Sequence, residues 1–165
     1  EAKISGLESD ITYLLTPDWT VATSFSYNQA ELAKDLVIGA NYSPSGTQLP
    51  NVPEFKGNIT SRYHFMVDDF EGHAQFVFSH VGETRSNIYK FTGGDTTTDT
   101  REINGSYQII NLSMGIDNEN WGVSFYVSNL TDERAQLTRG TAGWDSAITT
   151  NRPRTIGIKY HMIFE

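Results

Sequence analysis

The last ten residues before the C-terminal glutamate alternate in polarity. Bulky apolar residues occupy one parity, and four of the five residues at the other parity are small or polar. A period of two residues over this length is typical of a β-strand with one apolar and one polar face, whereas an amphipathic helix requires a period of 3.6. The segment 155–164 therefore predicts a strand.

Six further segments show the same alternation. Glycine (14), tyrosine (8) and phenylalanine (9) are abundant, and we find no long segment with a helical period. The chain is therefore predicted to be all-β, with seven strands. The other six strands are expected at 7–15, 19–27, 58–65, 73–80, 109–116 and 121–128.

The connections between these segments alternate between short and long. Short turns are expected near 17–18, 68–69 and 118–119, whereas the connections at about 32–54, 85–106 and 131–151 have roughly twenty residues, well above the usual hairpin loop. Short turns at one end and long loops at the other are typical of an antiparallel up-and-down transmembrane β-barrel of the outer membrane. The expected strands, about ten to thirteen residues long, suit a tilted span.

Composition excludes several classes of protein. Twelve basic against twenty acidic residues give a net charge of −8, which argues against a nucleic-acid partner. The absence of cysteine excludes disulfides, thiol nucleophiles and cysteine-based zinc sites. No apolar run reaches the roughly 20 residues of a membrane helix. A mean hydropathy of −0.41 is still compatible with a barrel, because barrel strands alternate in polarity.

No motif for catalysis or for a cofactor stands out, so we expect no enzyme activity and no cofactor. His64 and His73 flank one short turn at the polar parity, but no third ligand has suitable spacing. We interpret both as polar residues that face the lumen.

The barrel interpretation assigns a face to each parity. The apolar parity faces lipid, and the aromatic residues Tyr13, Trp19, Tyr63, Trp121, Tyr160 and Phe164 form a girdle near the short turns. The residues predicted to face lipid in the last three strands are Ile110, Leu112, Met114, Ile116, Trp121, Val123, Phe125, Val127, Ile156 and Ile158.

Two C-terminal segments carry a resemblance to a known family. The first is Ser-Asn-Leu-Thr-Asp-Glu-Arg-Ala at 128–135, and the second begins with Asn-Arg-Pro-Arg-Thr-Ile-Gly at 151 and runs to Phe164. Together they resemble the C-terminal signature of TonB-dependent outer-membrane receptors. Ser-Gly-Leu-Glu at 5–8, Leu-Pro-Asn-Val-Pro at 49–53 and Asn-Trp at 120–121 resemble the family as well, so the likeness extends over essentially the whole chain.

This resemblance implies a 22-stranded barrel around an N-terminal plug domain. Such a receptor resides in the Gram-negative cell outer membrane and takes up a scarce nutrient, for example a ferric siderophore, with energy from TonB. Residues 1–165 then form the last seven strands or so, without the plug and the TonB box. The implied partners are outer-membrane lipid, lipopolysaccharide, TonB through the plug segment, the barrel-assembly machinery and a small-molecule ligand.

The resemblance also implies roles for particular residues. Tyr160, Met162 and Phe164 correspond to the C-terminal signal that the barrel-assembly machinery reads. The family usually ends on the aromatic residue, whereas here Glu165 follows Phe164.

Four arginines lie in or beside the last long connection. Arg134, Arg139, Arg152 and Arg154 suit contacts with lipopolysaccharide phosphates or with an anionic ligand, since guanidinium groups bind such oxygens in pairs. Ion pairs with Asp132, Glu133 and Asp145 are the favoured alternative.

Two other proteins fit the same alternation. One is a small autonomous outer-membrane barrel, for which eight strands and 165 residues are a suitable size. The other is a secreted β-sandwich that binds carbohydrate. The number of strands, and whether a second layer covers the apolar face, distinguish these alternatives from a fragment of a larger barrel.

Overall fold

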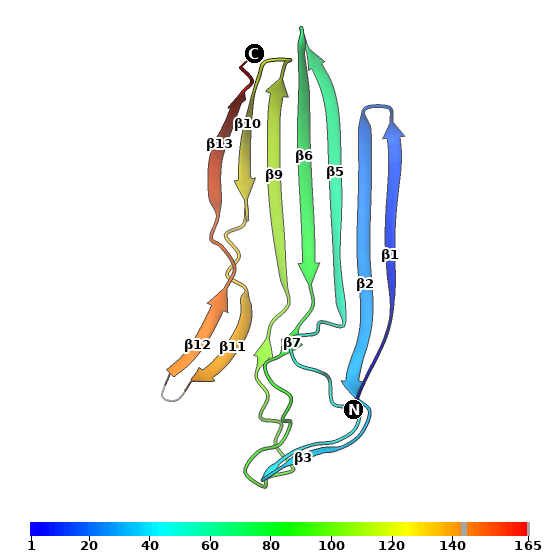
Figure 1. Ribbon diagram of the computed structural model, residues 1–165, viewed down its shortest axis with the longest axis vertical. Helices are drawn as coiled ribbons and strands as arrows, with labels where there is room; N and C mark the ends of the chain where they lie inside the picture. The colour runs from blue at the N-terminus through cyan, green and yellow to red at the C-terminus, as the bar shows by residue number, and fades with distance from the viewer. Residues whose placement is uncertain (143–144, 165) are drawn as a thin grey trace.

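A computed structural model describes residues 1–142 and 145–164, with the side chains at 140–146 and all of Glu165 outside that description. Seven strands form one antiparallel sheet in the order β1-β2-β5-β6-β9-β10-β13 (Figure 1). The seven strands thus lie side by side in the order in which they occur along the chain. The seven strands predicted from the sequence are confirmed. Their bounds are β1 Ala2–Thr16, β2 Trp19–Leu32, β5 Phe55–Val67, β6 Phe70–Val81, β9 Tyr107–Asp117, β10 Trp121–Ser128 and β13 Thr155–Met162.

The two ends of the sheet differ in their connections, as the sequence predicts. Tight turns join the strands at one end, where the C-terminus also lies, and the long connections extend from the other (Figure 1). Each long connection contains a small two-stranded ribbon that the sequence analysis missed. The ribbons are β3 (Leu36–Ile38) with β4 (Asn41–Ser43), β7 (Thr84–Arg85) with β8 (Ile103–Asn104), and β11 (Gln136–Ala142) with β12 (Asp145–Thr150).

The short turns form where their residue types predict them. Asp68 takes a positive φ of 52°, which aspartate tolerates better than most residues. In the turn after β9, the Asn118 side-chain oxygen accepts hydrogen bonds from the main-chain N–H groups of Asn120 (3.0 Å) and Trp121 (2.8 Å). These bonds fix the chain reversal that leads into β10.

The register aligns the apolar parity of all seven strands on one face. Trp19, Tyr63, Ala74, Met114 and Phe125 are successive partners from β2 to β10. The same parity continues through Ile158 in β13 and through Tyr13 in β1. Since a slip of one residue would turn a strand's apolar side chains to the other face, seven consistent registers make the face continuous.

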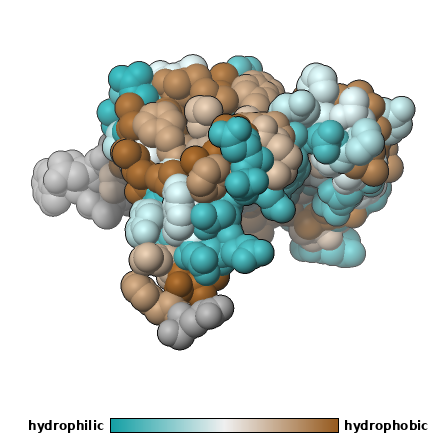
Figure 2. Space-filling view, turned by 90° about the horizontal axis from the view of Figure 1, so that it is seen from above, coloured by the Kyte–Doolittle hydropathy of each residue, from teal (hydrophilic) through white to brown (hydrophobic). Residues whose placement is uncertain are grey.

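No second layer covers this face within the described part of the chain. Among all described residues, the only buried apolar ones are Ala30, Leu32, Val127 and Ala135. Ile158, on the apolar face, is 73% exposed. Viewed from above, apolar atoms gather along one side of the sheet and polar atoms along the other (Figure 2). A β-sandwich would enclose its apolar face between two sheets, so the sandwich alternative does not match this structure.

The sheet is also open. β1 and β13 form its two edges, and neither pairs with the other among residues 1–142 and 145–164. Seven strands in an open sheet do not make the closed eight-stranded barrel that was the other alternative. Within the described residues, no helix has the length and apolar character needed to cross a bilayer.

Two strands are shorter than the ten to thirteen residues expected for a tilted span, although β10 has the bounds 121–128 that the alternation predicts. β10 has eight residues because the chain turns away at Asn129, which has a φ of 54°. β13 also has eight residues and ends at Met162, so Phe164 lies beyond the strand. The Ile163 N–H still donates to the Asn120 carbonyl (2.8 Å), which holds the segment after β13 against the neighbouring turn.

Candidate functional site

The polar face of the sheet contains two hollows bounded by hydrogen-bonding side chains. The first has a volume of about 390 Å³ and lies over β1, β2, β5 and β6. Its lining includes Glu8, Asp10 and Lys56, and the Asn58 amide donates to the Ser24 hydroxyl (2.7 Å) at its floor. Such a surface suits the polar inner face of a barrel wall.

The second hollow lies where β9, β10 and β13 approach the long connections. It has a volume of about 320 Å³, and its lining includes Asn111, Tyr126, Asn129, Arg152 and Thr155. The two segments that carry the family resemblance therefore meet at this hollow. It combines one cation with several neutral hydrogen-bonding groups.

Asn129 forms the centre of a clamp between the end of β10 and the start of β13. Its side-chain N–H₂ group donates to the carbonyls of Glu133 and Arg152, at 3.0 Å each, and its side-chain oxygen accepts from the Glu133 N–H at 2.9 Å. The residue is only 4% exposed. One buried amide thus links two segments that are more than twenty residues apart in the chain.

Two further asparagines extend the clamp. The Asn129 N–H donates to the Asn111 side-chain oxygen (2.9 Å), which adds β9. Asn151 accepts from the Ala135 N–H (2.9 Å) and donates to the Glu133 carbonyl (3.0 Å). The sequence analysis quoted these segments for their resemblance and did not predict this role. The sequence did contain one local sign of a tight turn after β10. Asn129 and Asp132, three residues apart, both belong to residue types that tolerate a positive φ.

The carboxylate of Asp132 completes the clamp. It accepts hydrogen bonds from the Arg154 main-chain N–H (2.8 Å) and from the Arg134 guanidinium (3.2 Å). The Arg154 N–H is the main cause that lowers the pKa of Asp132 below its usual value, and the two arginine charges act in the same direction.

This shift predicts a dependence on pH. Because the folded pKa lies below the unfolded value near 3.8, the carboxylate stabilises the clamp fully above about pH 4, and the stabilisation is lost as the pH falls through the folded pKa. Above about pH 4, we expect the Arg154 amide to be better protected from hydrogen exchange in the wild type than in Asp132→Asn. This difference between the two proteins should disappear as the pH falls below about 4. Identical profiles for the two proteins would contradict the charged contact.

The four predicted loop arginines have different environments. Arg134 pairs with Asp132, as the favoured alternative expected, but Arg139 pairs with Glu102 in the preceding long connection (2.8 Å). Arg154 donates to the Leu130 carbonyl (3.4 Å). Arg152 forms no ion pair with any described side chain, while the side chain of Asp145 lies outside the described residues.

The long connections are joined to one another. Tyr42 and Phe91 stack with ring centroids 6.0 Å apart and exchange two main-chain hydrogen bonds of 2.9 Å. Arg101 donates to the Gln48 carbonyl (3.2 Å) and the Gly94 N–H donates to the Ala40 carbonyl (3.0 Å), so the first and second connections meet at several points. The Arg139–Glu102 ion pair joins the third connection to the second. The three long connections are therefore joined into one layer at their end of the sheet.

The histidines on the polar face lie near the short turns. His64 and His73 are direct partners across β5 and β6. Asp117 lies between His73 (3.4 Å) and His161 (3.7 Å). Within the described chain, no three histidine, aspartate or glutamate side chains are arranged to hold a metal ion.

The residues predicted to face lipid all lie on the apolar face. Ile110, Leu112, Met114 and Ile116 of β9 align with Val123, Phe125 and Val127 of β10 and with apolar-parity residues of β6, and Trp121, Ile156 and Ile158 continue the same face. Nine of these ten are half-buried or exposed, while Val127 is 8% exposed. Tyr160, Met162 and Phe164, predicted to form the assembly signal, are all exposed, at 59%, 49% and 83%.

The fold therefore defines a segment of barrel wall, apolar on one side and polar on the other. Residues 1–130 match the model of the family described as TonB dependent receptor-like, beta-barrel. The chain belongs to this family, which confirms the resemblance found in the sequence. The family and the structural neighbours are receptors and transporters, not enzymes.

Solved structures show the same fold. The ferric yersiniabactin uptake receptor FyuA from Yersinia pestis superposes with a TM-score of 0.72 at 19% identity, over 99% of this chain and 24% of its own. The ferric-catecholate import receptor Fiu from E. coli K12 gives 0.71 at 22% identity, over 99% and 21%. The copper transporter OprC gives 0.67 at 20% identity, over 99% and 24%.

The chain spans about a quarter or less of the length of these structures. A comparison with curated proteins found no match.

Proposed function

We propose that this chain is the C-terminal part of the barrel of a TonB-dependent receptor in a Gram-negative outer membrane. The receptor takes up a scarce nutrient such as a ferric siderophore. Residues 1–165 then supply the last strands of a 22-stranded wall, and the plug and the TonB box belong to other parts of the protein.

One observation carries this proposal. The registers place the apolar parity of all seven strands on one uncovered face, while tight turns and long connections separate to opposite ends. A bilayer around the barrel would cover the apolar face, and a polar lumen would hydrate the other. The family match and the siderophore receptors among the neighbours support a role in nutrient uptake.

The open edges support the same proposal. Unpaired N–H and C=O groups along β1 and β13 would be costly in lipid. Further strands of the whole protein would pair with both edges and close the barrel. Tyr160 and Met162 in β13, with Phe164 just beyond it, would then be presented to the barrel-assembly machinery.

Arg152 is the best candidate among the four arginines for contact with an anionic ligand. It lines the hollow on the polar face, whereas Arg134 and Arg139 are held in ion pairs. A ligand in the lumen therefore fits Arg152 better than a lipopolysaccharide phosphate, which would lie on the outer face. The Tyr126 hydroxyphenyl and the Asn111 amide line the same hollow.

Uptake of labelled iron tests the function. A bacterium that lacks this gene should take up at least one ferric siderophore more slowly under iron limitation, and the wild-type gene should restore uptake only when TonB is present. Uptake of every tested chelate at the parental rate, or restoration without TonB, would contradict the proposal.

The same assay tests Arg152. We expect Arg152→Gln to raise the ligand concentration for half-maximal uptake by about threefold to tenfold, the value of one charge-assisted contact. Arg134→Gln is the matched control, because it removes an equal charge whose partner is Asp132. Equal effects of the two substitutions would show that Arg152 has no particular role in ligand binding.

A further inference from the structure

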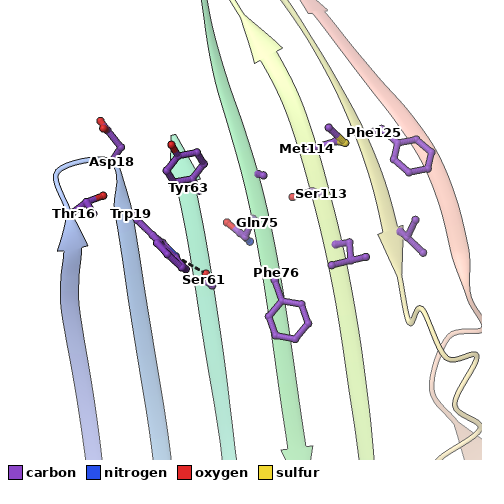
Figure 3. A pocket seen from close by; sticks show the side chains of 13 residues that line it. Thr16, Asp18, Trp19, Ser61, Tyr63, Gln75, Phe76, Ser113, Met114 and Phe125 are labelled. Atoms are coloured by element: carbon purple, nitrogen blue, oxygen red, sulfur yellow. Dashed lines mark hydrogen bonds between the residues drawn. The ribbon is translucent and has the colours of Figure 1, made fainter. Parts of the chain in front are cut away.

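A groove crosses the apolar face near the short turns. It has a volume of about 940 Å³ and is lined mainly by apolar side chains from β2, β5, β6, β9 and β10 (Figure 3). Five strands spaced about 4.8 Å apart make such a groove roughly 19 Å long across the sheet. It is the largest of the hollows described for the two faces.

Small residues at two neighbouring positions create the groove. Ala74 faces Tyr63 across the β5–β6 ladder, and Ser61, two residues along β5, faces Phe76. These two positions are diagonal neighbours on the apolar face, so they leave a depression between larger side chains. Phe76, with Met114 and Phe125 beyond it, forms the opposite wall.

The wall formed by Trp19 and Tyr63 is fixed in position. Their rings meet edge to face at 81°, with centroids 6.3 Å apart. The indole N–H of Trp19 donates to the Ser61 hydroxyl (2.9 Å), as the dashed line in Figure 3 shows. The one polar group of the indole is therefore satisfied within the sheet, and its rings present carbon to the groove.

The groove has a polar mouth at the turn between β1 and β2. Thr16 and Asp18 line it there, and Asp18 is the only carboxylate among the described residues of the lining. The turn is held against β5 because the Asp18 carbonyl accepts from the His64 N–H at 2.8 Å. The Asp18 carboxylate thus lies at one end of the apolar groove.

We propose that this groove binds one acyl chain of a phospholipid whose headgroup carries a primary ammonium, with the ammonium on the Asp18 carboxylate. Hydrocarbon matches the lining, and a headgroup cation complements the only charge at the mouth. Trp19 and Tyr63 suit this depth, since aromatic rings gather where a bilayer meets water. The proposal rests on the membrane location given under Proposed function.

Native mass spectrometry of the intact protein from mild detergent tests the acyl-chain site. We expect the wild type to retain one phospholipid that Ala74→Phe loses, because the phenyl ring fills the floor of the groove. Leu7→Phe is the matched control, since Leu7 lies on the same face in β1, outside the groove, and is 62% exposed. Retention of the same lipid count by Ala74→Phe, in a sample that folds normally on a gel-shift assay, would overturn the site.

Asp18→Asn tests the headgroup. In an equal mixture of phosphatidylethanolamine and phosphatidylcholine with the same acyl chains, the wild type should prefer the ethanolamine lipid by about threefold, a value within the range for an exposed ion pair. Asp18→Asn should abolish this preference and keep one bound lipid. Asp69→Asn, at the next short turn, should retain the preference for the ethanolamine lipid. The assignment would be overturned if Asp69→Asn lost this preference or if Asp18→Asn kept it.

The outcome is separable from the proposed function. Ala74→Phe should leave nutrient uptake unchanged, since the groove and the polar hollows lie on opposite faces of the sheet. A receptor that transports normally but retains no groove lipid would refute only the lipid site. A protein that does not insert into bilayers would refute the proposed function first.

Discussion

Replacing Leu112 with arginine is expected to lower the free energy of unfolding by about 2–4 kcal/mol, the cost of placing a cation on the lipid face near the bilayer midplane. Leu112 is the sixth of the eleven residues of β9 and faces Phe76 on one side and Val127 on the other. Leu112 is therefore far from both ends of its strand. At either end, an arginine side chain could extend to the interface between membrane and water and avoid most of this cost. Urea unfolding of the intact protein in phospholipid vesicles measures the change.

Val77→Arg is the matched control for this substitution. Val77 lies on β6 beside Phe76, but its partners are Thr60 and Asn111 on the polar face. Val77 is half-buried, but it faces the polar side of the sheet, so the same type of change, from an aliphatic side chain to arginine, should cost only about 0.5 kcal/mol, as for an ordinary surface position. If both substitutions had equal costs, the assignment of the two faces would be wrong, and with it the membrane location.

The strands and their faces were predictable because their signals are local. Alternation at 109–116 and at 121–128 sets the parity of each strand, and the Asn118 turn between them leaves few registers. Once those registers are fixed, neighbouring apolar positions must share a face. The open sheet and its odd strand number followed from counting the same segments.

Features that depend on the approach of distant segments were not predictable. The ribbon β11–β12 has the first strand Gln-Leu-Thr-Arg-Gly-Thr-Ala, which shows no sustained alternation. Arg139 pairs with Glu102, 37 residues away, because two long connections meet above the sheet. The groove likewise requires the register of five strands, since Ser61 and Ala74 have no unusual sequence context.

The family-like motif at the end of β10 has a structural explanation. Asn129 and Asp132 adopt φ values of 54° and 55°, and Asp132 donates its N–H to the Asn129 carbonyl at 3.0 Å. The chain therefore turns sharply after β10, and the side chains of both residues bond to the segment that begins β13. The sequence alone does not indicate that Asn129 and Asp132 bond to a segment more than twenty residues away.

Asn129→Ala should be the most destabilising substitution in this clamp, at about 3–4 kcal/mol. The substitution removes three hydrogen bonds of a 4%-exposed side chain, at about 1 kcal/mol each, and places alanine at a positive φ at a further cost of about 1 kcal/mol. Urea unfolding of the intact protein measures the total. Hydrogen exchange should quicken at the Arg154 and Ala135 amides, which the clamp holds, and remain unchanged in β5 and β6.

Two other substitutions at the same position separate the contributions. Asn129→Gly also removes the three bonds but allows the positive φ, so it should be about 1 kcal/mol less destabilising than alanine. Asn129→Asp keeps the acceptor for the Glu133 N–H and loses both donors, and it brings a carboxylate against the carbonyls of Glu133 and Arg152. It should therefore remain well below the wild type in stability. A cost near 0.5 kcal/mol for alanine, typical of an exposed loop residue, would show that β10 and β13 are held together by their ladder alone.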